Sequence, residues 1–166
     1  MEELSENVLD STELINNFHK RNIKFIEDCF SEREEIKPMG LILVPNGDML
    51  YAALDFSTLE IKEQSTDQFH SAIIDNNGIA YAIMAEGWSA QVDKKDFEKI
   101  KHTIRPSKHP DRIEIITYYF EAKNISKLVM WEIKREKNIK PFLVLILDQD
   151  NDNPDVLLSK FSGFIE

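Results

Sequence analysis

The chain is poor in cysteine and glycine and has no long apolar run. Cys29 is its only cysteine, so neither an internal disulfide framework nor a multi-cysteine zinc site can form. A membrane-spanning helix needs about twenty consecutive apolar residues, and no stretch of the chain approaches that length. The first turn is acidic, whereas a secretory signal peptide begins with a basic region. These absences predict a cytoplasmic location without contact with a membrane.

The common catalytic and ligand-binding motifs are also missing. The sequence contains no glycine-rich phosphate loop, no Gly-x-Ser-x-Gly and no His-Glu-x-x-His, which argues against the usual nucleotide-binding, hydrolase and zinc-protease classes. The histidines lack the spacing of metal ligands, and the acidic segment 148–155 lacks the glycine and the final glutamate of a calcium loop. We therefore expect no cofactor and no metal, and no catalytic residue is assigned.

Negative charge is concentrated at the two ends of the chain. The formal net charge is −10, of which residues 1–37 carry −5 and residues 148–166 carry −4. Residues 38–147 are therefore almost neutral, and nonspecific binding to nucleic acid is disfavoured. Acidic ends favour solubility, and they could also imitate a polyanion and occupy the basic groove of a partner protein.

Hydrophobic periodicity and turn signals predict a single α+β domain over residues 1–166, with residues 1–9 flexible. The expected order is α-β-β-α-β-β-β-β, with a mainly antiparallel sheet of about five to six strands and helices on one face. The crossover from the second strand through the second helix could add one parallel pair. Residues 57–64 fit either a strand or a helix. The predicted helices are 11–35 and 65–76, and the predicted strands are 41–44, 49–56, 79–88, 113–122, 127–135 and 141–147.

Two segments allow more specific predictions. In the first helix, Leu14, Phe18, Phe25 and Cys29 fall on one face, which predicts that Cys29 is a buried small hydrophobic residue with no redox role. Residues 79–88 are almost all apolar, as expected for a strand that is covered on both faces or lies at the centre of the sheet. We expect this strand to pair with residues 113–122.

A basic stretch lies between these two strands. Residues 93–112 carry a net charge of +3 in a chain that is otherwise acidic, and 93–101 fit a short helix. The stretch is either a solvated loop and helix surface or a contact for an anion or an acidic partner.

Two short strings flank the basic stretch. Glu86-Gly87-Trp88 ends the apolar strand, and residues 105–114 lead into the next strand. If the strands pair, a carboxylate at the end of a buried strand needs a partner, for which an arginine is well suited. Glu86 with Arg105 or Arg112 is therefore either a structural ion pair or part of a binding site. The candidate ligand- or partner-binding residues are Glu86, Trp88, Arg105, Ser107, His109, Arg112 and Glu114.

These strings resemble a pattern in small uncharacterised proteins of phage and prophage regions. Those proteins carry Glu-Ala-Trp at the end of a strand, followed by Arg-Pro-Ser-x-x-Pro-x-Arg-x-Glu; here Gly87 replaces the alanine. The resemblance covers about residues 79–122 and implies a shared fold and a phage-related role. It transfers no activity. The positions that match are Glu86, Trp88, Arg105, Pro106, Ser107, Pro110, Arg112 and Glu114.

The missing catalytic motifs and the segregated charge favour a non-enzymatic interaction or accessory protein. Its partner would be another protein, and the resemblance implies an origin in a mobile element and a target in the host. The alternative is a small enzyme or ligand-binding domain whose site is formed by Glu86, Trp88 and the segment Arg105–Glu114. The sequence leaves the oligomeric state open.

Overall fold

The computed structural model describes residues 2–89 and 112–150, and the side chains from residue 11 onward within them. Its element order agrees with the predicted α-β-β-α-β-β-β-β arrangement of an α+β fold. The elements are α1 (Glu2–Arg33), β1 (Met39–Leu43), β2 (Met49–Ala53), α2 (Leu59–Asp75), β3 (Ala80–Ser89), β4 (Ile113–Ala122), β5 (Ile125–Lys134) and β6 (Phe142–Asp150).

The six strands form one sheet in the order β2-β1-β3-β4-β5-β6, and every neighbouring pair is antiparallel. The predicted pairing of residues 79–88 with 113–122 is confirmed, because β3 pairs with β4 over their whole lengths. The expected parallel pair is absent from the described sheet. The crossover through α2 places β3 beside β1, and β1 separates β3 from β2.

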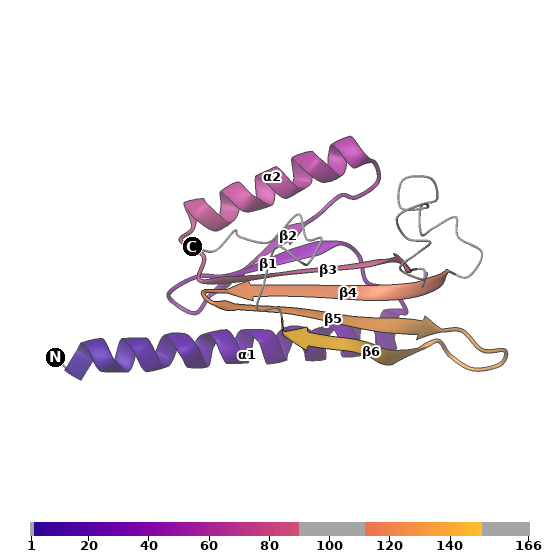
Figure 1. Ribbon diagram of the computed structural model, residues 1–166, viewed down its shortest axis with the longest axis horizontal. Helices are drawn as coiled ribbons and strands as arrows, with labels where there is room; N and C mark the ends of the chain where they lie inside the picture. The colour runs from indigo at the N-terminus through magenta and orange to yellow at the C-terminus, as the bar shows by residue number, and fades with distance from the viewer. Residues whose placement is uncertain (1, 90–111, 151–166) are drawn as a thin grey trace, which may run out of the picture.

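The two helices cover opposite faces of the sheet (Figure 1), so the expectation of helices on one face is wrong. The alternation of side chains along β3 gives the reason. Ala82 and Met84 point into the core under α1, whereas Tyr81 and Ile83 point into the core under α2. A strand that is apolar on both sides needs cover on both sides, and one helix lies on each.

Helix α1 begins earlier than the periodicity indicates. The predicted start near residue 11 is wrong, because the helix begins at Glu2 and includes the segment expected to be flexible. It ends at Arg33, where Glu34 has a φ of 57° and its N–H donates to the carbonyl oxygen of Phe30. A left-handed residue at this position closes a helix, although glycine usually occupies it.

The buried face of α1 also differs from the predicted one. Asn22 lies four residues after Phe18, and Phe30 lies eight residues after Asn22, so the three share one helical face. All three are buried. Phe25 was assigned to this face but is exposed, and Cys29 is only partly buried, so both predictions are wrong. An asparagine in the middle of the apolar row hides the true face from a search for hydrophobic residues.

Helix α2 removes the ambiguity over residues 57–64. Thr58 is its N-cap, and the Thr58 hydroxyl accepts from the N–H of Ile61, so most of the ambiguous segment is helical. The predicted start at Ser65 is wrong. The Ser65 hydroxyl instead accepts from the backbone N–H of Asp55 and so ties the helix to the loop after β2. Gly78 follows the helix as predicted, and its N–H donates to the carbonyl oxygen of Ile73.

Gly40 allows α2 to approach β1. A Cβ atom at Gly40 would overlap the ring of Phe69, whereas a Cβ atom at Gly87 would have nothing within 4 Å. We expect Gly40→Ala to lower the free energy of unfolding by about 1–3 kcal/mol, because the core under α2 would be overpacked. Gly87→Ala is the matched control and should change it by less than about 0.5 kcal/mol. Denaturant unfolding of both variants checks this, and equal effects would contradict it.

His19 lies between α1 and the sheet, with its Nδ1 atom 3.1 Å from the hydroxyl oxygen of Tyr118. Burial lowers the pKa of His19 below its ordinary value of 6.5; Lys127 lowers it further, while Asp148 and Asp150 oppose the shift. The unfolded chain therefore binds a proton at a pH where folded His19 does not. We expect the free energy of unfolding to fall as the pH decreases from about 7 towards 5.5, and less steeply in His19→Gln. Chemical denaturation across this pH range measures both slopes, and identical slopes would show the prediction to be wrong.

Candidate functional site

Four of the predicted site residues lie where the paired ends of β3 and β4 meet. Glu86 and Trp88 are near the end of β3, Arg112 directly precedes β4, and Glu114 is opposite Trp88 in the register. Glu86 continues the row of Ala82 and Met84, which faces α1. Arg105, Ser107 and His109, the predicted helix 93–101 and nearly all of the basic stretch lie outside the described residues.

The carboxylate of Glu86 is bound by the backbone that leaves α1. One of its oxygens accepts from the N–H of Ile36 at 2.8 Å. Desolvation by partial burial raises the pKa of Glu86 above its ordinary value. The N–H of Ile36 and the charge of Arg135 oppose this shift, whereas the nearby carboxylates of Glu35 and Glu114 add to it. Glu86 is therefore a carboxylate that would gain from an additional positive charge.

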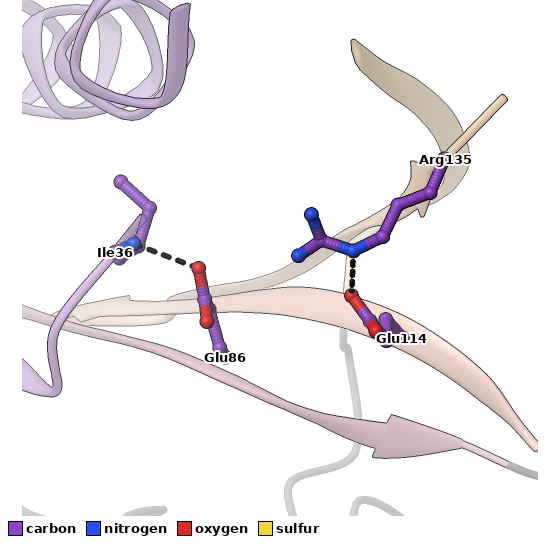
Figure 2. Close-up of polar contacts among 4 residues, drawn as sticks. All are labelled: Ile36, Glu86, Glu114 and Arg135. Carbon is purple, nitrogen blue, oxygen red and sulfur yellow. Dashed lines mark hydrogen bonds and ion pairs between the residues drawn. The ribbon is translucent and has the colours of Figure 1, made fainter. Parts of the chain in front are cut away.

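Glu114 has an arginine partner that sequence reasoning missed. The Nε atom of Arg135 donates to Oε2 of Glu114 at 2.8 Å. Figure 2 shows Glu86 and Glu114 on neighbouring strands, with the guanidinium of Arg135 reaching over them from the end of β5. The predicted meander holds the signal for this contact. Its first turn, between the strands predicted at 113–122 and 127–135, brings the end of the second of these strands beside the start of the first.

Trp88 and Arg112 form the exposed part of this group. The guanidinium carbon of Arg112 lies 4.9 Å from the centroid of the Trp88 ring, and 41% of Trp88 is exposed. We call Glu86, Trp88, Arg112, Glu114 and Arg135 the end cluster. It combines two carboxylates, two guanidinium groups and an aromatic face at one end of the sheet.

The cover of α1 over the sheet ends before the end cluster. Met84 is 0% exposed under α1, whereas Glu86 and Trp88, the next residues on the same face of β3, are exposed. Helix α1 stops at Arg33, and the chain then turns to enter β1. The change along β3 from core to surface therefore follows directly from the length of the helix.

A second polar group is buried on the opposite face of the sheet. The hydroxyl of Tyr81 donates to the carboxylate of Glu121 on the neighbouring strand, and the ring of Tyr119 lies 6.1 Å from that of Tyr81. Burial raises the pKa of the Tyr81 hydroxyl far above its ordinary range, and the bond to Glu121 adds to this. Sequence reasoning did not find this group, because a lone glutamate in an apolar strand carries no motif.

A groove lies away from both groups, between α1 and β6. It encloses about 330 Å³ and is lined by Glu27, Phe30, Ser31, Trp131, Lys140, Pro141, Phe142, Leu143 and Leu145. Within residues 2–89 and 112–150, no three His, Cys, Asp or Glu side chains are placed to hold a metal ion. Neither described helix combines the length and the apolar character that crossing a membrane requires.

Comparison with known proteins adds no relative. No protein-family model matches the chain, and no curated protein or solved structure matches it significantly. The end cluster must therefore be interpreted from its own chemistry.

The exposure of Glu86 favours a surface role over a structural one. We expect Glu86→Gln to change the free energy of unfolding by less than about 1 kcal/mol at pH 7, because the contacts of a carboxylate that is only partly buried are screened by water and the amide oxygen can still accept from Ile36. Tyr81→Phe is the contrasting variant. It should cost about 1–3 kcal/mol, because it removes a donor from the buried Glu121 carboxylate. Denaturant unfolding of the two variants at pH 7 compares them, and a larger loss in Glu86→Gln would instead support a structural pair.

Proposed function

We propose that the chain is a non-enzymatic accessory protein that binds another protein through the end cluster. The observation that carries this proposal is the exposed pair of Trp88 and Arg112, with the guanidinium of Arg112 over the indole ring at the end of the sheet. Tryptophan and arginine are the side chains that most often dominate the energy of protein interfaces. A pair in contact also has less side-chain freedom to lose on binding than two separate side chains.

The charges around the pair define the chemistry of the partner. Glu86 and Glu114 flank Trp88, Glu35 adds a further carboxylate near Glu86, and the whole chain carries −10. A basic side chain of the partner beside Glu86 would relieve the repulsion among these carboxylates. The partner surface should therefore combine a lysine or arginine with an apolar hollow that receives the Trp88 ring.

The resemblance to phage and prophage proteins supports a host protein as this partner. Six of the eight matching positions lie in residues 105–114, and both matching positions on β3, Glu86 and Trp88, belong to the end cluster. A surface that binds a host protein would use exposed side chains of this kind. An enzyme would instead need a catalytic group, and none of the familiar catalytic motifs supplies one here.

Affinity capture with matched variants tests the proposal. The immobilised chain should retain a protein from host-cell lysate, and Trp88→Ala and Arg112→Ala should each reduce its recovery at least about tenfold, as loss of an interface hot spot does. Tyr51→Ala is the control, because Tyr51 is an exposed aromatic residue on β2, at the far edge of the sheet. Circular dichroism should show that all three variants are folded. Equal recovery by Trp88→Ala and the wild type would contradict the proposal.

A further inference from the structure

The last strand of the sheet has an unpaired, apolar edge. Within the described residues β6 pairs only with β5, and it is one of the two edges of the sheet. Its side chains remain exposed although they are apolar: 54% of Leu145 and 43% of Ile146 are accessible. Phe142 and Val144 are exposed as well. Among the residues that the structure describes, the outer backbone edge of this strand has no neighbouring strand, and four of its apolar side chains are exposed.

Proteins usually protect the exposed edge of a sheet against pairing with other chains, and β6 has few of these protections. Residues 142–147 contain no charge and no proline, which are two common devices against edge-to-edge pairing; a third, a β-bulge, is confined to Ile146. The ladder with β5 has an irregularity opposite Met130 and Trp131, so β6 is regular from Phe142 to Leu145. The strand at the other edge of the sheet, β2, has five residues, whereas β6 has nine. A long apolar edge of this kind is suited to bind another strand.

The two ends of β6 carry opposite charges. Lys137 and Lys140 precede the strand, and Asp148 lies near its end, whereas Asp150 is already paired with Lys127 of its own chain. Two antiparallel copies of β6 would therefore place the basic turn of each copy beside the acidic end of the other. The contact between a basic turn and an acidic end would then occur twice, because every contact in a two-fold interface has a symmetric copy.

We propose that β6 pairs with β6 of a second copy of this chain, antiparallel and about a two-fold axis near Val144. In this register Leu143 of one copy is opposite Leu145 of the other, and Lys140 lies near Asp148, which follows the irregularity at Ile146. The two sheets then continue as one sheet of twelve strands, six from each copy. Each copy uses its β6 edge to bind the β6 edge of the other copy. The apolar pattern and the charges of this edge must therefore both be complementary to themselves.

The groove beside β6 fits the same partner. Leu143 and Leu145 point from β6 into this groove of about 330 Å³, together with Phe30 of α1 and Trp131 of β5. A two-fold axis perpendicular to the sheet places both α1 helices on one side. Leu143 and Leu145 of the second copy would then lie against the open side of the groove and extend its apolar lining.

Sedimentation equilibrium of the full chain tests the interface. The wild type should be a dimer, and Val144→Lys should raise its dissociation constant at least about tenfold, because it places two like charges opposite each other at the axis. Ile74→Lys is the control, since Ile74 is an exposed aliphatic residue on α2, away from the β6 edge, and it should leave the dimer intact. Circular dichroism confirms that the variants are folded. A monomeric wild type, or a dimer that survives Val144→Lys, would overturn the proposal.

A charge exchange tests the antiparallel direction. Lys140→Glu and Asp148→Lys should each weaken the dimer about tenfold at low salt, because each places like charges together at both ends of the interface. The double variant should restore the wild-type dissociation constant. Lys140 also donates to the carbonyl oxygen of Ser31 within its own chain, so circular dichroism should first show that Lys140→Glu is folded. A double variant that is weaker than both single variants would overturn the antiparallel pairing. The experiment is independent of Trp88, so it can fail without affecting the proposed function.

Discussion

The burial of β3 on both faces is the constraint on which the rest of the fold depends. Tyr81, Ile83 and Met84 are all buried, although successive side chains point to opposite sides. A strand of this kind requires a neighbour on each edge and a layer on each face. β1 and β4 supply the edges, and α1 and α2 supply the layers. The same requirement explains why position 40 is a glycine. Helix α2 can pack on the sheet only if the ring of Phe69 lies directly on the backbone of Gly40.

The surface chemistry follows from where this cover stops. α1 protects the sheet as far as Met84, and the last residues of β3 leave the core and carry charge or an indole ring. At the far side of the sheet β6 extends away from β3, and its apolar side chains are only partly covered by α1. The end cluster and the β6 edge therefore arise from one cause: two helices cannot cover a sheet of six strands completely.

Much of the architecture could be predicted from the sequence, because the signals that define it are local. Turn residues and apolar runs determine the element order, and the pairing of β3 with β4 follows from their length and composition. The apolar run of β3 left two interpretations open, cover on both faces or a central position in the sheet, and only the first requires α1 and α2 to lie on opposite faces. At the end cluster, Glu86 was identified by its place at the end of an apolar strand. The backbone N–H of Ile36 could not be found, because every residue has such a group and only the path of the chain after α1 selects this one.

The ladder between β3 and β4 has a consequence for how the chain can change over evolution. Its last pair joins Ser89 to Ile113, so the chain leaves the sheet and returns to it at neighbouring points. The free energy of closing a loop depends only weakly on its length, and each doubling costs about 0.6 kcal/mol. Insertions or deletions between these two residues would therefore leave the ladder almost equally stable. Selection by a binding partner can therefore change the number of residues between Ser89 and Ile113 at little cost to the ladder, while the ten paired positions on either side preserve the fold.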